Sequence, residues 1–295
     1  MKAKKKDLYL SDKPPLSTVG KINLALSYLI LIIWSIVIIW PLSQMVIAAF
    51  NGKQGRNIVM GSDYEFSFKH FEYLFTETNY LNWTKNTILI SLSTAILTLI
   101  IVSFTGYVYS RFRFKGKKAS LIAILLIQTI PAFAGITAYF TLHSIISSVF
   151  PFFTRQMILV LIYSAGGIAA NTFILKGYLD SISTELDDAA KIDGCSNLQI
   201  YRLILMPIAR PMLAIIGLWS FIGPFMDLLL PKVLLTNVES YTLTAGLFTL
   251  INDVSKMNQP AYAAGGLLTA IPIVIMFVAL RKQLVSGLAS GSVKG

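Results

Sequence analysis

Charged residues and cysteine are both scarce in this chain of 295 residues. Only 13% of the residues are charged, whereas soluble domains usually carry about 25%. The single cysteine, Cys195, excludes an intrachain disulfide. The two histidines, His70 and His143, are far apart, and no Cys or His pair has metal-ligand spacing, so we expect no metal site. No polar stretch is long enough to form a second, soluble domain.

Motifs for nucleotide chemistry and catalysis are also missing. No Gly-x4-Gly-Lys-Ser/Thr sequence occurs, so the chain is not expected to bind ATP through a P-loop or to hold a cofactor. No catalytic groups cluster, which argues against an enzyme. The net charge of +11 would suggest nucleic acid in a soluble protein. Here the basic residues lie in short loops between apolar runs, so we expect no nucleic-acid partner.

Long apolar runs fill most of the chain, and 55% of its residues are hydrophobic. About 20 apolar residues cross the hydrocarbon core as a helix. The first run, Ile22 to Phe50, exceeds the roughly 7–15 apolar residues of a cleavable signal peptide, so we interpret it as an uncleaved span. The sequence predicts an all-α integral membrane protein with six transmembrane helices, near residues 24–50, 86–110, 119–142, 157–175, 212–235 and 262–280.

The distribution of Lys and Arg predicts the orientation, because cytoplasmic loops carry an excess of both. With the N-terminus in the cytoplasm, the inside segments are the tail 1–23, the loop 111–118, the loop 176–211 and the tail 281–295. They hold six, five, four and three basic residues, 18 of the 25 in the chain. Both termini are therefore expected to be cytoplasmic, with the loop 111–118 as topology determinant beside lipid headgroups.

Two other features bear on the layout. The outside segment Asn51–Trp83 is crowded with aromatic residues, which gather at membrane interfaces, so it predicts a short interfacial helix or a docking site for an external partner. Prolines lie in or near the predicted spans and indicate kinks at Pro41, Pro131, Pro224 and Pro272.

The inside loop 176–211 is longer than a connection between two spans requires. Ser183 or Thr184 can cap a helix, and the acidic residues that follow lie in its first turn, where the helix dipole favours anions. Gly194 suits the left-handed position that ends a helix. A second short helix is expected from Ser196, and Pro207 with Pro211 would stop or bend it.

The charge of this loop runs against the basic trend of the inside segments. From Asp180 to Cys195 there are five acidic residues and one basic residue. A solvated, self-capped helix would explain them, and so would a rigid knob for a cytoplasmic partner. The residues alone leave both interpretations open.

The loop resembles the "EAA" loop of ABC importer permeases. That pattern is Glu-Ala-Ala, three residues, Gly, nine residues, Ile, one residue and Leu-Pro; here it reads Asp188-Ala-Ala, Gly194, Ile204 and Met206-Pro207, with Asp188 for Glu and Met206 for Leu. Lys191-Ile-Asp-Gly194 is similar to the Arg-Ile-Asp-Gly of sugar permeases. The tail 287–295 resembles the ending of MalG-type permease subunits of maltose-type importers. The similarity covers about residues 86–295.

The resemblance implies a type I ABC importer permease fold in a bacterial inner membrane. It implies an assembly with a second, MalF-like permease subunit, two ATPase subunits that bind ATP and Mg, and an extracellular sugar-binding protein. The cargo would be an oligosaccharide such as maltose or maltodextrin, moved by alternating access. The C-terminal tail would be disordered or would reach between the ATPases. The implied ATPase-coupling residues are Glu185, Asp187, Asp188, Ala189, Ala190, Asp193, Gly194 and Pro207.

A path for neutral sugars needs aromatic faces and hydrogen-bonding groups rather than strong charge. Four residues in or beside the predicted spans supply these groups: Gln128, Tyr139, Asn171 and Asp227. A carboxylate at the bilayer centre costs about 2.5–3.5 kcal/mol on insertion scales, so Asp227 should face the protein interior or water, as path lining or in a structural pair. Here the sequence departs from the common sugar-permease pattern, with Gly223-Pro-Phe-Met-Asp227 in place of Trp-Asn-Glu-Phe. An ion-gradient-driven secondary transporter is the alternative function; it would share the spans without needing the acidic loop.

Overall fold

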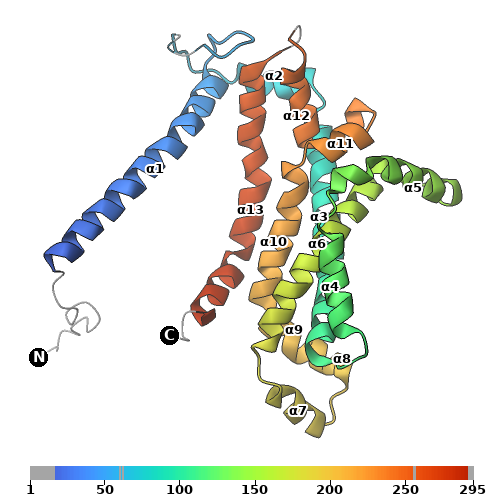
Figure 1. The fold of residues 1–295 in the computed structure, drawn as a ribbon. Helices are drawn as coiled ribbons and strands as arrows, with labels where there is room; N and C mark the ends of the chain where they lie inside the picture. Colours follow the sequence, from blue (N-terminus) through green and yellow to red (C-terminus); the bar gives the residue numbers. More distant parts are fainter. Residues whose placement is uncertain (1–16, 60, 62, 255–256, 292–295) are drawn as a thin grey trace, which may run out of the picture.

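The protein is an elongated helical bundle in the computed structural model, which describes residues 17–59, 61, 63–254 and 257–291 (Figure 1). No strand occurs among these residues; an isolated bridge joins Asn51 and Phe66. The upper end in Figure 1 carries α2, α11 and α12, and the lower end carries α7 to α9. The helices are α1 Thr18–Phe50, α2 Lys69–Glu77, α3 Tyr80–Arg111, α4 Lys117–Ile127, η1 Ala132–Gly135, α5 Ile136–Val149, α6 Arg155–Asp180, α7 Glu185–Ile192, α8 Asn197–Gln199, η2 Ile200–Leu205, α9 Met206–Ile208, α10 Arg210–Met226, α11 Leu229–Leu234, η3 Val238–Ser240, α12 Leu243–Asn252 and α13 Gln259–Gly291.

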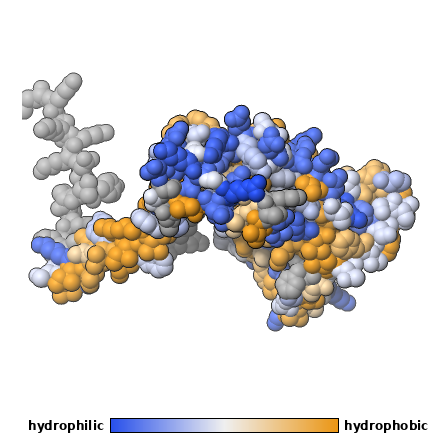
Figure 2. All heavy atoms as spheres, turned by 90° about the horizontal axis from the view of Figure 1, so that it is seen from above, coloured by the Kyte–Doolittle hydropathy of each residue, from blue (hydrophilic) through white to orange (hydrophobic). Residues whose placement is uncertain are grey.

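Four helices of the described chain are each long and apolar enough to cross a membrane: α1, α3, α6 and α13. A fifth span is formed if Asn197–Ile208 and Arg210–Met226, which meet at a bend of 77°, are taken together. The spans predicted near 24–50, 86–110, 157–175 and 262–280 each lie within one of the four long helices. Figure 2 shows hydrophilic residues gathered over the upper end and hydrophobic residues along α1 and the flanks.

The third predicted span, 119–142, is not one helix. It is divided among α4, η1 and α5, and α5 runs across the bundle rather than along it (Figure 1). Pro131 has no amide hydrogen for a helical bond and disfavours a helical conformation at the residue before it. The amides of Thr129 and Ile130 accordingly make tight turns to Leu126 and Ile127. A proline predicted to kink a helix therefore helps to end it.

The fifth predicted span, 212–235, is also interrupted. α10 stops at Met226, and Asp227 has an extended backbone with φ −89° and ψ 125°. The Asp227 carboxylate accepts the amide hydrogens of Leu229 at 2.9 Å and Leu230 at 3.4 Å, so it starts α11 as a side-chain cap.

Helices extend into both predicted tails where the structure describes them. α1 begins at Thr18, inside the predicted N-terminal tail, and α13 continues through Gly291, inside the predicted C-terminal tail. Residues 1–16 and 292–295 lie outside the described chain, so the tail predictions are not addressed there.

Two buried cores hold the bundle together. The upper core joins α2, α3, α10 and α12 around fully buried residues such as Leu74, Trp83 and Leu243. The lower core joins α3 and α6 to the segment 187–209, and includes Val102, Leu175, Ala190, Ile200 and Leu205. The segment predicted to be a cytoplasmic loop is thus part of the packed structure at its lower end.

The first turns of α3 anchor the connection that crosses the upper end. The Trp83 indole donates to the Val238 carbonyl at 2.7 Å, and the Asn86 amide donates to the Tyr241 carbonyl at 3.1 Å. The Thr87 hydroxyl accepts the Leu243 amide hydrogen at 2.6 Å. These bonds position α12, a short apolar helix that the sequence analysis does not predict.

α1 stands apart from the bundle over most of its length (Figure 1). Its most apolar window has no residue buried inside this chain, and only Ala48 and Ala49 at its C-terminal end are buried. A helix that is hydrophobic all round needs lipid or other membrane helices around it.

Candidate functional site

The lower end of the molecule presents a short helix, α7, between the ends of α6 and α8 (Figure 1). The Ser183 hydroxyl accepts the amide hydrogen of Glu185 at 3.2 Å, and three carboxylates follow in the first turn. Gly194 ends the helix with φ +83°, and the next amide, that of Cys195, donates to the Ala190 carbonyl at 2.9 Å. The start and the end of α7 are those that its local sequence predicts.

α7 has a buried face and an exposed face. Asp187 and Ala190 are buried against the bundle. On the other side Ile192 is 87% exposed and Leu186 is 45% exposed. These two large apolar side chains form the centre of an exposed surface of α7. The surface also includes the exposed residues Glu185, Asp188, Ala189 and Asp193.

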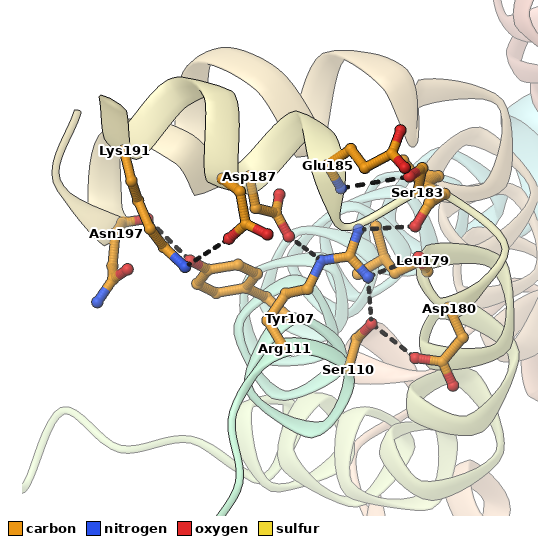
Figure 3. A network of polar contacts seen from close by, with 12 residues as sticks. Tyr107, Ser110, Arg111, Leu179, Asp180, Ser183, Glu185, Asp187, Lys191 and Asn197 are labelled. Atoms are coloured by element: carbon orange, nitrogen blue, oxygen red, sulfur yellow. Dashed lines mark hydrogen bonds and ion pairs between the residues drawn. The ribbon is translucent and has the colours of Figure 1, made fainter. Parts of the chain in front are cut away.

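The buried face of α7 is tied to α3 by an ion pair (Figure 3). Arg111 Nε lies 2.5 Å from Asp187 Oδ2, and the two side chains are 9% and 8% exposed. The same guanidinium donates to the carbonyls of Leu179 at 2.9 Å and Ile182 at 3.2 Å. Asp187, predicted to belong to the docking carboxylates, therefore faces inward, and Asp188 beside it faces out with a 3.5 Å contact to Lys191.

The sequence analysis missed this pair because it treated Arg111 only as a topology determinant. The available signal was a basic residue directly after one predicted span and an acidic run after another, both on the predicted cytoplasmic side. Which of two adjacent carboxylates turns inward depends on the packing of α7 against α3, and the sequence pattern does not contain that information.

The chain leaves α7 through a second, sharply capped segment. Ser196 and Gln199 form a reciprocal capping box at the start of α8. η2 then adopts a π-helix, with the Met206 amide bonded to the Tyr201 carbonyl. Pro207 lies in α9 and the chain bends by 77° before α10, since neither Pro207 nor Pro211 can donate a helical hydrogen bond. Pro207 is therefore beside the predicted bend.

A polar cavity of about 490 Å³ opens between α3, the loop 112–116 and α7. Tyr107, Arg111, Arg113, Asp187 and Lys191 contribute to its lining. No group of three or more His, Cys, Asp or Glu residues in the described chain could hold a metal ion.

The four predicted path residues do not share one site. Gln128 and Tyr139 line a mainly apolar cavity of about 650 Å³ between α4, α5 and α6, and the Gln128 amide donates to the Gly166 carbonyl at 2.6 Å. Asn171 lies further along α6, outside that cavity's lining. Asp227 accepts the Tyr163 hydroxyl at 2.9 Å and caps α11, so its carboxylate is in a structural pair.

Comparison with known proteins supports a transport role. Residues 103–289 match the family "Binding-protein-dependent transport system inner membrane component". The chain is 41% identical over 279 residues to the maltodextrin transport permease MdxG of Bacillus subtilis, covering 95% of this chain and 99% of that protein. It is 40% identical to the galactooligosaccharides transport permease GanQ of the same organism, covering 93% and 96%. It is 37% identical to the maltodextrin transport permease MalD of Streptococcus pneumoniae, covering 93% and 97%.

Solved structures show the same fold. A bacterial ABC transporter that imports the acidic polysaccharide alginate superimposes with a TM-score of 0.75 at 21% identity, covering 92% of this chain and 99% of that one. The methionine ABC transporter MetNI, in an inward-facing form, gives a TM-score of 0.55 at 15% identity, covering 73% and 97%. The fold is that of ABC importer permeases, and the family assignment removes the ion-gradient-driven alternative. This chain belongs to the binding-protein-dependent transport system inner membrane component family, the membrane-spanning permease subunits of ABC importers.

Proposed function

We propose that this permease subunit passes an oligosaccharide of the maltodextrin class across a bacterial cell membrane. Two relatives, each covering more than nine tenths of both chains, are maltodextrin permeases. A galactooligosaccharide permease is almost as similar, at 40% identity, so galactosyl oligosaccharides are the competing cargo. Sugars of either kind are neutral and rich in hydroxyl groups.

The exposed face of α7 is the surface that docks on an ATPase subunit. The observation that carries this proposal is Ile192, which is 87% exposed at the C-terminal end of α7. A rigid helix with an apolar centre and a carboxylate rim suits a groove with basic edges. Glu185, Asp188 and Asp193 form the rim. Asp187 and Ala190 face the bundle, Gly194 ends the helix, and Pro207 lies beside the bend to α10.

The remaining partners follow from what one chain cannot supply. Two ATPase subunits bind ATP and Mg, because this chain has no P-loop. A second permease subunit completes the pathway and covers membrane helices that this chain leaves exposed, including α1. An extracellular sugar-binding protein delivers the cargo to the upper end. Both termini are cytoplasmic, on the side of α7 and of the basic loop 111–118.

Within this chain, Gln128 and Tyr139 are the residues proposed to meet the sugar. They line the same cavity and offer an amide and an aromatic ring with a hydroxyl. Asn171 lies beyond that cavity on α6. We propose that the sugar meets it after it has left the cavity. Asp227 shapes the break between α10 and α11 rather than contacting the sugar.

The test reconstitutes the full transporter, with both permeases, the ATPases and the binding protein, in proteoliposomes. Maltotriose should stimulate ATP hydrolysis and enter the vesicles. Joint Asp188→Lys and Asp193→Lys changes should abolish the stimulation and the uptake, because they reverse the charge of the α7 rim. The matched control keeps the negative charge at the same two positions, Asp188→Glu with Asp193→Glu, and should retain both activities.

Two results would overturn parts of this proposal. Stimulation by a galactosyl oligosaccharide and none by maltotriose would reject the maltodextrin class. Normal uptake by the Asp188 and Asp193 double variant would reject docking through the rim of α7.

A further inference from the structure

Arg111 of α3 contacts α7 and the end of α6 at the lower end of the bundle (Figure 3). It is the last residue of α3. Its guanidinium meets Asp187 of α7 and donates to the carbonyls of Leu179, near the end of α6, and of Ile182, which follows α6. It also donates to its neighbour Ser110 at 3.1 Å, and Ser110 donates to Asp180 at 2.7 Å. The guanidinium therefore makes three hydrogen bonds through its two terminal nitrogens and an ion pair through Nε.

The electrostatics of the two helix ends favour this placement. The last carbonyls of α6 carry partial negative charge, which attracts a cation. Asp187 lies in the first turn of α7, where the partial positive charge favours an anion. The guanidinium thus bridges the negative end of one helix and an anion at the positive end of the next. Its planar fork lets one side chain make these contacts together, whereas the ammonium of lysine is a single point.

Arg111 is the last of three residues on one face of α3 that contact the segment from α7 to η2. Ser103, Tyr107 and Arg111 are spaced by four residues, so they lie on one face of the helix. The Ser103 hydroxyl lies 2.8 Å from the Tyr201 hydroxyl, and the Tyr107 hydroxyl donates to the Asn197 carbonyl at 3.0 Å. The Tyr201 ring also stacks on Phe104, with ring centroids 4.7 Å apart. These three side chains therefore attach α3 to the segment that runs from α7 to η2.

The connection to α10 has a different character. It passes through a π-helix and two prolines and bends by 77°. π-helical turns and prolines are common causes of sharp helix bends, because they interrupt the regular hydrogen-bond ladder. α7 is consequently tied to α3 and α6 by buried polar contacts and to α10 by a bent peptide segment.

We infer that Arg111 is a positioning residue that makes α7, α3 and the end of α6 move as one body, so that a displacement of α7 reaches the transmembrane helices through α3 first. This inference rests on the proposed docking of α7 on an ATPase. It assigns to Arg111 and Asp187 a role in transmission inside the permease, separate from the contact surface of Ile192. The basic loop that follows α3 begins directly after Arg111.

The first experiment measures sugar transported per ATP hydrolysed by the complete transporter in proteoliposomes. Arg111→Lys keeps the charge and loses the fork, and Asp187→Asn keeps the size and loses the charge. Each should lower the ratio by about two- to thirtyfold, the range over which residues of a coupling network shift coupling. Both variants should still co-purify with the ATPases, because neither side chain belongs to the exposed face of α7.

The chain offers a matched arginine as control. Arg155 begins α6 at the upper end, where it donates to the Leu234 carbonyl at 3.3 Å and to the Thr236 hydroxyl at 2.8 Å without touching α7. Arg155→Lys removes a bridging guanidinium of the same kind and should leave the ratio unchanged. Equal losses in the Arg111 and Arg155 variants would overturn the inference, since the effect would then not be specific to the α7 joint.

A double variant guards against simple misfolding. Arg111→Met with Asp187→Leu removes both buried charges, a replacement that other buried ion pairs often tolerate. It should assemble with its partners and remain uncoupled. Normal coupling in an assembled double variant would overturn the inference. Failure of the wild-type chain itself to bind the ATPases would instead reject the proposed function, so the two failures are distinguishable.

A distance measurement provides a readout that loss of stability alone would not produce. In a background with Cys195→Ser, nitroxide labels are placed at Lys191→Cys, an exposed position of α7 outside the proposed docking surface, and at Lys85→Cys near the upper end of α3. ATP binding should leave the distance distribution between them narrow and unchanged. In the Asp187→Asn background, ATP should shift or broaden it, because α7 then moves without α3. A distance that changes in the wild type, or stays fixed in both, would overturn the inference.

Discussion

The glycine that ends α7 is the position where one added methyl group should have a sharply defined effect. Gly194 has φ +83°, and no atom lies within 4 Å of the position that a Cβ would occupy. Gly194→Ala therefore introduces no clash, and its whole effect comes from the left-handed backbone, which costs an L-residue about 1–2 kcal/mol. That free energy corresponds to a factor of roughly 5–30 in the population of the native turn.

Gly177 in α6 is the matched control. It also has open space around its Cβ position, but it lies within a regular helix. Alanine is more favourable than glycine there by roughly 0.5–1 kcal/mol, so Gly177→Ala should be neutral or slightly stabilising. The pair differs in backbone conformation and not in crowding.

The assay is hydrogen exchange of the backbone amides at the end of α7, with sugar uptake as the functional readout. The Cys195 amide, bonded to the Ala190 carbonyl, should exchange about 5–30 times faster in Gly194→Ala, since the turn that protects it is destabilised. Uptake should fall in that variant and not in Gly177→Ala. Gly194→Asn should show a smaller effect, because asparagine tolerates the left-handed region. Unchanged exchange and uptake in Gly194→Ala would refute the argument that φ controls this turn.

Three further predictions concern other parts of the chain. A Cβ at Gly246 would lie 2.1 Å from the buried Trp83 ring, so Gly246→Ala should sharply lower the yield of folded protein, as measured by size-exclusion chromatography, and Trp83→Leu should partly restore it. Burial lowers the pKa of His70 below its ordinary value of about 6.5, so its contribution to stability is fully present above pH 6.5 and is lost as the pH falls towards the folded-state pKa. The free energy of opening of the α2 amides, obtained from exchange rates corrected for the intrinsic effect of pH, should therefore fall between pH 7.5 and 5.5, and His70→Gln should remove that dependence. With the native cysteine replaced by serine, Lys115→Cys should react with an impermeant thiol reagent only from the cytoplasmic side and Asp63→Cys only from outside; the reverse pattern would invert the proposed orientation.

Local signals in the sequence were sufficient to predict α7. A hydroxyl before a run of carboxylates, alanines in the middle and a glycine at the end specify the start and the end of a helix without long-range information. The capping box at Ser196 is local in the same sense, although its π-helical continuation is not. These elements form where the sequence analysis expects them.

Long-range packing decided the features that could not be predicted. Asp187 and Asp188 are adjacent and chemically identical, and only the position of Arg111 at the end of α3 turns the first inward. Hydropathy does not distinguish an apolar run that spans the membrane from one that is broken within it. The run 119–142 therefore read as one span, although its helix ends before Pro131. α12 is apolar but only 10 residues long, so it gave no span signal.

Path residues were the least predictable part of the site. Polar groups within predicted spans can line a path, cap a helix or join two helices, and the sequence does not separate these roles. Gln128 and Tyr139 share a cavity, whereas Asp227 accepts the Tyr163 hydroxyl and two backbone amides. The Asp227 carboxylate thus has its hydrogen-bond partners within this chain.

The most direct test of the account is a cross-link from α7 to its partner in intact membranes. A photoreactive amino acid in place of Ile192, which is 87% exposed, should capture an ATPase subunit on illumination. The same amino acid in place of Lys85, near the opposite end of α3, should not. Capture of the ATPase from position 192 alone would support α7 as the coupling contact. Capture from position 85 and not from position 192, or from neither while the transporter is active, would contradict it.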